Sequence, residues 1–370
     1  MRSSSDLILT GAWRICVAAS EAKERYRTLD AMRGLAALAV AAYHFQQRTG
    51  NGSIAGYLAV DLFFVLSGFV VALNYTDRFA MGLTVRRFVE LRMIRLLPLY
   101  ALGMTLGLTK LLVGFTLHMA PAAALGSVPC AAAFGIAMLP DPCSPELFPL
   151  NGPSWSLFFE LAINIAFAIL LWRATRLVLG SLMAVSAIFL LWRVGSPDYF
   201  NLGWAWHNLD GGIARTVYSF CAGVVLFRIL PRKQPKPGLA ALIPVSAVIG
   251  ILVFAGNTSH RAMVEIITVC MVFPAFIASG CLFDIPGPSI RRLSGFLGDL
   301  SYPVYSIHWP LVTVFSIVLE RFELSVALST FLFLAAITFL GYGAMQIDIF
   351  ARAQMKTMFR PRWRLPLRTL

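Results

Sequence analysis

The chain has 370 residues, of which 58% are hydrophobic and only 13% are charged, and its mean hydropathy is +0.74. A soluble domain is about 45–50% apolar and about 25% charged, so a soluble chain of this composition could not cover its apolar side chains with polar surface. The same numbers exclude a disordered chain, a collagen-like chain and a disulfide-rich scaffold. The sequence therefore predicts an integral membrane protein.

The net charge of +13 comes largely from short clusters of Lys and Arg that separate apolar runs. Such clusters are typical of the cytoplasmic loops of multi-pass proteins. Nucleic-acid binding would need a basic face with stacking aromatic residues on a soluble module, so no nucleic-acid partner is predicted. The clusters lie at 23–27, 86–95, 228–236, 291–292 and 352–368.

Eleven stretches approach the length of about 20 apolar residues that a helix needs to cross a bilayer. They are 29–46, 56–75, 93–114, 119–139, 154–172, 177–193, 212–230, 238–255, 262–283, 299–319 and 325–345. An odd number would place the two basic ends on opposite sides of the membrane, against the positive-inside rule. Segment 119–139 is the weakest, because Pro121 and Pro129 interrupt it, and we predict that it is re-entrant or interfacial.

We therefore predict an all-α polytopic transmembrane helical bundle of about ten spans with both termini cytoplasmic. Residues 1–27 form a cytoplasmic tail, 28–350 the transmembrane domain and 351–370 a basic cytoplasmic tail. The first 27 residues are not expected to be a signal peptide, because Arg14 cuts their short apolar stretch.

Six cysteines show no CxxC pair and no metal-ligand spacing, so no metal site is predicted. Most of them lie in apolar runs and are expected to be small core residues. Cys130 and Cys143 could pair if both faced an oxidising compartment.

The first span carries Asp30, Arg33 and His44, and ionisable residues inside a membrane are functional candidates. Arg33 and His44 are eleven residues apart, which returns them to one helical face, about 16 Å apart along the axis. The face offers a cation near the cytoplasm and an imidazole in the outer half. The alternative for His44 is a hydrogen-bonded packing role.

The next two spans add Asp61, Arg92 and Arg95. Asp61 is expected in the outer half, at a depth similar to that of His44, or else as a polar residue at the end of its span. Arg92 and Arg95 lie three residues apart on one face. They are either a positive-inside anchor or a fork that binds phosphates.

In the segment 151–160, Ser156 and Glu160 lie one helical turn apart in an otherwise apolar span. We expect Glu160 near the outer end of that span, where it needs a partner such as His44 or an arginine. Trp155 is a candidate cavity residue or an interfacial aromatic residue.

The segment 298–311 contains Tyr302, Ser306 and His308, together with two prolines. A polar, interrupted helix of this kind is expected to line a cavity, where freed backbone groups find partners. Arg215 and Glu265 are further ionisable residues within spans, and we expect them in helix-packing pairs.

These segments together resemble the acyltransferase 3 family of bacterial integral-membrane acyltransferases, which modify cell-surface carbohydrates. The resemblance covers about residues 25 to 350. Departures from the family pattern are mild, with Met32 where Leu is usual and Ala59 where Gly is common. The segments that match, in family order, are 27–34 with His44, 61–69, 92–100, 155–160 and 301–311.

The resemblance implies an enzyme that transfers groups other than amino-acyl groups. It moves an acyl group, most commonly acetyl, from cytoplasmic acyl-CoA to a hydroxyl of a carbohydrate or glycolipid acceptor, in the bacterial inner membrane. Acetyl-CoA is a co-substrate, and no bound cofactor is expected. The family's essential pair corresponds here to Arg33 and His44, in agreement with the face argument. The sequence does not indicate the acceptor or the oligomeric state.

Acyl transfer needs a base for the acceptor hydroxyl, oxyanion stabilisation and a grip on the anionic donor. His44 is expected to be the base or a transient acyl carrier, either of which requires a neutral imidazole. Asp61 or Glu160 could orient its second ring nitrogen.

Arg33, Arg92 and Arg95 would hold the donor. Asp30, Trp155, Ser156, Tyr302, Ser306 and His308 would line the cavity.

The alternative is a carbohydrate transporter or flippase, because interrupted helices and midplane charges are also transporter features. Transporters of that kind often show internal repeats, and none is visible in the sequence. A purely structural membrane subunit would leave the alignment of Arg33 and His44 unexplained.

Overall fold

The computed structural model describes residues 26–50, 52, 54–118, 123–193, 200–231, 234–258 and 260–358. These residues form a bundle of helices, and a single parallel pair of two-residue strands, β1 (Lys236–Pro237) and β2 (Phe283–Asp284), joins two loops. The helices are α2 (Arg27–Arg48), α3 (Ala59–Ala80), α4 (Val85–Thr116), α5 (Ala123–Ile136), α6 (Ser154–Ala166), α7 (Arg176–Arg193), α8 (Leu209–Ile229), α9 (Leu242–Phe254), α10 (Arg261–Ile267), α11 (Phe273–Leu282), α12 (Pro288–Glu320) and α13 (Val326–Met358).

Within the described residues, nine helical segments are long and apolar enough to cross a membrane. A π-helical turn at Phe167–Leu171 extends α6, and another at Thr268–Val272 joins α10 to α11, so each of these segments spans as one unit. The α2 helix is not among these nine, although its 22 residues correspond to about 33 Å, so the count of about ten spans stays a prediction. The predicted all-α polytopic bundle is confirmed.

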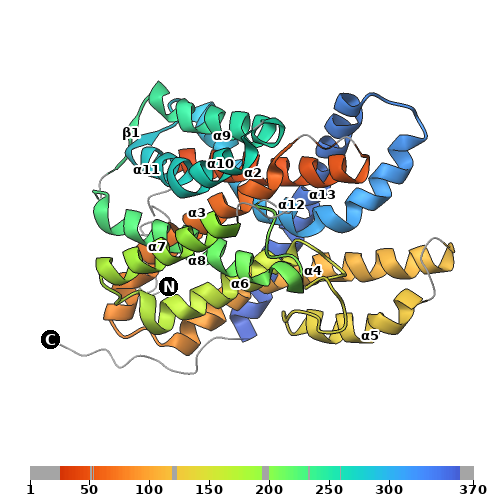
Figure 1. The fold of residues 1–370 in the computed structure, drawn as a ribbon, viewed down its shortest axis with the longest axis horizontal. Helices are drawn as coiled ribbons and strands as arrows, with labels where there is room; N and C mark the ends of the chain where they lie inside the picture. The colour runs from red at the N-terminus through yellow and green to blue at the C-terminus, as the bar shows by residue number, and fades with distance from the viewer. Residues whose placement is uncertain are drawn as a thin grey trace, which may run out of the picture.

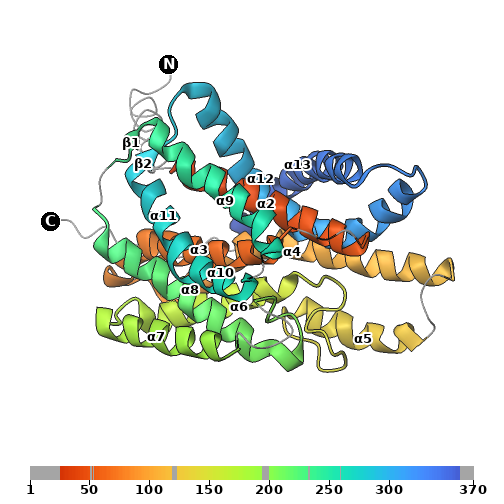
Figure 2. The ribbon, with the colours of Figure 1, turned by 45° about the horizontal axis from the view of Figure 1, so that its top comes forward.

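Segment 119–139 contains the 14-residue α5, whose length of about 21 Å is too short to cross a hydrocarbon core of about 30 Å. Figures 1 and 2 show α5 beside α4, at the edge of the bundle. A disulfide joins Cys130 of α5 to Cys143 in the loop that follows. The pairing left open by the sequence is therefore present, and in the predicted orientation this region lies on the outer, oxidising side.

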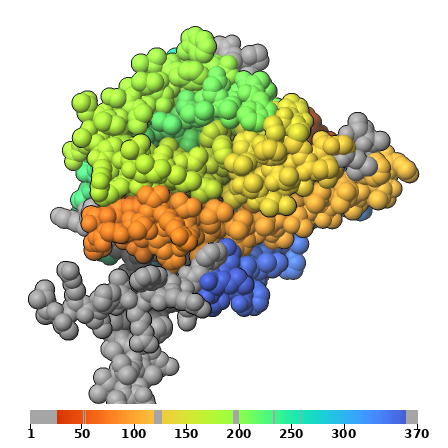
Figure 3. Space-filling view, turned by 90° about the horizontal axis from the view of Figure 1, so that it is seen from below, coloured from red at the N-terminus to blue at the C-terminus, as the bar shows by residue number. Residues whose placement is uncertain are grey.

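The α2 helix runs through the middle of the molecule, next to α12 and below α9 (Figure 1). Beside it, α3 and α8 approach so closely that a Cβ added to Gly68 would lie 2.1 Å from the carbonyl oxygen of Phe220. The reciprocal contact joins Gly223 of α8 to the carbonyl oxygen of Val65. Small residues permit such approach between helices in a membrane. Figure 3 shows the other face, where the surface of α3 and α4 separates α6–α8 from the end of α13.

The connection before α6 dips into the bundle. Cβ atoms added to Gly103 and Gly107, in the middle of α4, would lie 2.2 Å from the carbonyl oxygen of Ser306 and 2.0 Å from that of Leu150. Asn151 also donates from its side-chain amide to the carbonyl oxygen of Ser306, at 3.0 Å. As a result, α6 begins inside the bundle rather than at its outer surface.

The last helix, α13, continues to Met358, eight residues beyond position 350, and the end of the transmembrane domain at 350 stays a prediction. Residues 1–25 and 359–370 lie outside the described residues, so the two cytoplasmic tails stay predictions. Arg228, in the last turn of α8, donates to the carbonyl oxygens of Leu171, Trp172 and Ala174, at the end of the α6 segment and just after it.

Substitution of Gly68 by Ala should destabilise the bundle, because the added methyl group would overlap the backbone of α8. Overpacking of this kind lowers the free energy of unfolding by about 1–3 kcal/mol. The thermal midpoint of the purified protein in detergent measures the effect. Gly343→Ala is the matched control, since a Cβ at that position meets no atom within 4 Å. Equal midpoints for the two variants would contradict the close α3–α8 contact.

Candidate functional site

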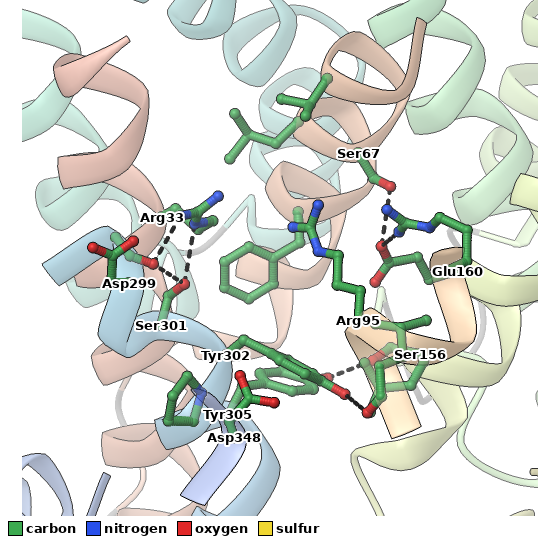
Figure 4. Close-up of a pocket in the computed structure, with 18 of the residues that line it drawn as sticks. Arg33, Ser67, Arg95, Ser156, Glu160, Asp299, Ser301, Tyr302, Tyr305 and Asp348 are labelled. Carbon is green, nitrogen blue, oxygen red and sulfur yellow. Dashed lines mark hydrogen bonds and ion pairs between the residues drawn. The ribbon is translucent and has the colours of Figure 1, made fainter. Parts of the chain in front are cut away.

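The cavity between α2, α3, α4, α6, α12 and α13 encloses about 570 Å³. In the predicted orientation its arginines lie in the cytoplasmic half, because they stand in the first turns of α2 and α4 and the last turns of α13. Val60 and Ser156, in the first turns of α3 and α6, line it further toward the outer side. Four arginines line it: Arg33, Arg92, Arg95 and Arg352. Figure 4 shows Arg33 and Glu160 on opposite sides, with Arg95 between them.

Arg33 is held by three hydrogen bonds, two to α12 and one to Asp30 of its own helix. Its Nε donates to Ser301 Oγ at 3.0 Å, and its Nη2 donates to the carbonyl oxygen of Gly298 at 2.8 Å and to Asp30 Oδ1 at 3.2 Å. The side chain is 29% exposed, so the guanidinium is fixed in direction and still accessible from the cavity. The placement of Arg33 near the cytoplasmic side stays a prediction.

Arg92 and Glu160 form an ion pair on the opposite wall, with Nη2 and Oε1 separated by 2.5 Å. Ser67 Oγ donates to the same carboxylate oxygen at 3.2 Å. The expectation that Glu160 lies near the outer end of its span is wrong, because Arg92 stands in the first turns of α4. The reason is the inserted connection before α6, which moves the whole helix inward.

Arg95 differs from its neighbours, since it makes no hydrogen bond or ion pair with another residue in the described part of the chain. Its side chain is exposed, whereas that of Arg92 is only 2% exposed. Arg352 is bound to Asp348, with Nε–Oδ1 and Nη2–Oδ2 distances of 2.8 and 2.5 Å. The cavity therefore presents one unneutralised cation and three oriented ones, which suits an anionic ligand.

The inner end of the cavity carries hydroxyl groups. Ser156 Oγ and the Tyr305 hydroxyl are 2.6 Å apart, and both donate to the carbonyl oxygen of Pro153, at 3.0 and 3.2 Å. The Tyr302 hydroxyl donates to the carbonyl oxygen of Leu96 at 2.6 Å. The prediction placed Ser156 and Tyr302 in a cavity lining, and both line this one.

His44 lies outside this lining, in a cluster of rings further along α2. Its imidazole stacks on that of His308, with centroids 5.3 Å apart and planes inclined by 24°. The indole of Trp309 meets it edge-on at 4.8 Å, and Tyr43 packs on it at the same distance. Two imidazoles and an indole thus gather about 16 Å along the helix from Arg33.

Asp61 is bound to Arg215, and both side chains are fully buried. The Oδ2–Nη2 distance is 2.6 Å, and Arg215 also donates to the carbonyl oxygens of Leu202 and Tyr57, both at 2.9 Å. Asp61 therefore closes a junction between α3, α8 and the loop before α8. Neither Asp61 nor Glu160 is hydrogen-bonded to His44 in this structure, which differs from the expectation that one of them orients the imidazole.

The remaining residues that we expected around a cavity have other surroundings. Asp30 binds Arg33, and Trp155 is buried under the Arg215 guanidinium, 5.6 Å from its ring centroid. Ser306 and His308 are buried on α12 beyond the cavity. The described lining adds Ser67, Asp299, Ser301, Tyr305, Asp348 and Arg352, which the prediction omitted. A carboxylate and an arginine four residues apart in the last span were the available signal for Asp348.

Among the described residues, Cys130, Asp141 and Cys143 lie close enough together to suggest a metal site. Both sulfur atoms, however, belong to the disulfide, and Asp141 Oδ1 accepts the backbone N–H of Cys143 at 2.8 Å. A disulfide sulfur is not a thiolate ligand, so this group does not fit a metal ion in its present state.

Removing the charge of Asp61 should destabilise the fold rather than block one step of the chemistry. Asp61→Asn leaves Arg215 buried beside a neutral group, and breaking a buried pair costs about 3–5 kcal/mol in the free energy of unfolding. The thermal midpoint of the purified protein in detergent measures this loss of stability. The control is Asp299→Asn, which changes an exposed carboxylate. An Asp61→Asn protein with an unchanged midpoint and no acylation would instead make Asp61 part of the chemistry.

The comparisons with known proteins agree with this architecture. Residues 26–345 match the family model of the acyltransferase 3 family, described as an acyltransferase domain. No solved structure is significantly similar to the chain.

Three curated proteins are similar to the chain. "Protein 2 in picA locus" of Rhizobium radiobacter is 37% identical over 45% of this chain and 94% of its own length. "Exopolysaccharide production protein ExoZ" of Rhizobium meliloti is 26% identical, over 74% of this chain and 81% of its own. BcsY of Komagataeibacter xylinus, whose name includes the words membrane-bound transacylase, is 27% identical over 79% of this chain and 74% of its own. The chain therefore belongs to the acyltransferase 3 family and is a multi-pass membrane acyltransferase.

Proposed function

We propose that the protein moves an acyl group, most simply acetyl, from acyl-CoA on the cytoplasmic side to a hydroxyl of an exported or cell-surface carbohydrate. The single observation that carries the proposal is the arginine-lined cavity in the cytoplasmic half. Acyl-CoA is a polyanion with a thioester at the end of a narrow arm, so a donor site must combine cations with a passage toward the reacting group. In the cavity, the cations are Arg33, Arg95 and Arg352.

The donor would enter with its phosphates toward the arginines. Arg95 is the group most ready to bind a phosphate, because it has no counterion within the described residues. Arg33 contributes a guanidinium whose direction is already set by Ser301 and Gly298, so little side-chain entropy is lost when it binds. Glu160 neutralises Arg92 and keeps that wall of the cavity in place.

The thioester would point toward Tyr305 and the histidine cluster. Tyr305 belongs to both regions, since its hydroxyl is bonded to Ser156 and its ring lies 5.6 Å from that of His308. A neutral imidazole at His44 can attack the thioester carbonyl or remove the proton of the acceptor hydroxyl. The buried Ser156 and Tyr305 hydroxyls lie along this route, and either would have to turn from the Pro153 carbonyl to donate to a developing oxyanion.

Two relatives support a carbohydrate acceptor. One carries a name that refers to exopolysaccharide production and another a name that refers to membrane-bound transacylation. A polysaccharide precursor that is exported would meet His44 from the outer side, and acyl-CoA is cytoplasmic. We therefore propose the bacterial inner membrane as the location. The family match favours this enzyme over a transporter or flippase.

Substitution of His44 by Ala should abolish acyl transfer while leaving membrane insertion unchanged. The reason is that no other described residue combines a position on the α2 face of Arg33 with a nucleophilic ring. Transfer of label from acetyl-CoA to surface glycan, or to water as acetate, measures the activity in proteoliposomes. His207→Ala, at an exposed histidine of another loop, is the control. Wild-type transfer by the His44→Ala protein would exclude both roles of His44.

Substitution of Arg33 or Arg95 by Ala should raise the apparent KM for acyl-CoA about 10-fold or more, because a charge-assisted hydrogen bond contributes about 1.5–3 kcal/mol. The control is Arg86→Ala on the same helix as Arg95, where the side chain is 91% exposed and paired with Glu90. Steady-state kinetics in proteoliposomes with acetyl-CoA supplied on the cytoplasmic face check the prediction. An unchanged KM in both cavity variants would place the donor elsewhere.

A further inference from the structure

His308 is a fully buried imidazole whose protonation is fixed by its own helix. Its Nδ1 lies 2.8 Å from the carbonyl oxygen of Tyr305 and 3.3 Å from that of Val304. A carbonyl oxygen can only accept a hydrogen bond, so Nδ1 carries the proton of the neutral ring. The other ring nitrogen, Nε2, therefore presents a lone pair.

The Nε2 atom has no hydrogen-bond partner in the described part of the chain, although it is shielded from solvent. An unsatisfied buried acceptor costs about 1–3 kcal/mol, so it needs an explanation. Two further buried polar atoms of this region lack a partner among the described residues. They are Asn151 Oδ1, whose amide nitrogen donates to the carbonyl oxygen of Ser306, and Ser306 Oγ, two residues before His308. The lone pair on His308 Nε2 fits a ligand group that donates a hydrogen bond, such as a hydroxyl.

The position of this ring is the second observation. The rings of His308 and His44 are stacked, with their centroids 5.3 Å apart and their planes inclined by 24°. A hydroxyl that approaches an acyl group on His44 would come within reach of a base on the adjacent ring. Trp309 and Gly152 close the cluster, since a Cβ on Gly152 would lie 3.2 Å from the indole.

We propose that His308 is a second catalytic residue, which takes the proton of the acceptor hydroxyl while His44 carries the acyl group. This assignment rests on the proposed function. In the first step a ring nitrogen of neutral His44 attacks the thioester, the carbon–sulfur bond breaks, and CoA leaves as a thiolate from an acyl-imidazolium.

In the second step the acceptor oxygen attacks the acyl carbon, its proton passes to His308 Nε2, and His44 leaves as a neutral imidazole. The proton of the His308 imidazolium then returns through water to the thiolate. Atoms and charges balance over the cycle, and no further reactant is needed. The two imidazoles have different tasks, and the ambiguity between base and carrier for His44 disappears.

The test separates the two half-reactions in proteoliposomes. The first is measured as exchange of labelled CoA into unlabelled acetyl-CoA without an acceptor, and the second as release of acetate with water as the acceptor. His308→Asn is the informative variant, because its side-chain amide can keep the contact with the Tyr305 carbonyl while the base is lost. His308→Ala serves as a second variant at the same position, and His207→Ala serves as the control.

We expect His308→Asn to retain exchange within about 3-fold of the wild type and to lose about 100-fold or more in acetate release, the usual contribution of a general base. Acetyl label should then accumulate on the protein. His44→Ala should lose both reactions, and His207→Ala neither.

Wild-type acetate release by His308→Asn would overturn the role of His308, and loss of exchange in both His308 variants would reduce it to support of His44. A wild-type protein that releases acetate without exchange would exclude a carrier and overturn the division of tasks. A wild-type protein inert toward acetyl-CoA in both assays would overturn the proposed donor itself. Failure of the further inference and failure of the proposed function are thus distinct results.

Discussion

The close contact between α2 and α12 is the constraint on which the site depends. A Cβ added to Gly34 would lie 2.6 Å from both the Cβ and the carbonyl oxygen of Leu297, and one added to Gly298 would lie 2.7 Å from Asp30. The helices can pack this tightly only because small residues stand at the contact. The register set there brings Ser301 and Gly298 to Arg33, and further along the same helices it brings His308 to His44.

The buried charges of the bundle divide into two groups by what surrounds them. Asp61 with Arg215 and Glu265 with Arg261 and Tyr57 tie helices and outer loops together, and they have their hydrogen bonds satisfied by protein groups. The arginines on the lining of the cavity are each paired with one carboxylate, except Arg95, which makes no ion pair within the described residues. Burying a charge in a membrane protein is unfavourable in free energy in either place. We infer that packing offsets this free energy for the first group and that a bound ligand offsets it for the second. Position in the sequence does not distinguish them.

The sequence predicted the architecture well, because hydropathy and the positive-inside rule act on each segment separately. The helical bundle and the short α5 followed from length, Pro121, Pro129 and the placement of basic loops, whereas nine of the ten expected spans are long and apolar enough in the described residues. The shared face of Arg33 and His44 followed from helical geometry. Glu160 was misplaced because its helix begins inside the bundle, and this depends on the contacts of Leu150 and Asn151 with α4, which no local pattern reveals.

Ion-pair partners that lie far apart in the sequence could not be predicted either. Asp61 and Arg215 are separated by 154 positions, and Arg92 and Glu160 by 68, so a carboxylate could be recognised as buried without its counterion being known. The assignment of Asp61 or Glu160 to His44 chose among plausible carboxylates by depth alone. In the structure the neighbour of His44 is instead another imidazole, supplied by α12.

Under the proposed function, this arrangement would separate recognition of the donor from transfer to the acceptor along one helix. Arg33 and His44 share a face of α2 but lie about 16 Å apart, so a donor bound through its phosphates would reach the imidazole only with an extended arm. Tyr305 stands between the two regions, bonded to Ser156 at the cavity and packed against His308 beyond it. A rigid bundle of this kind would then accept an anionic donor from the cytoplasm and present the acyl group to a hydroxyl on the other side, provided that the proton of that hydroxyl has a base next to His44.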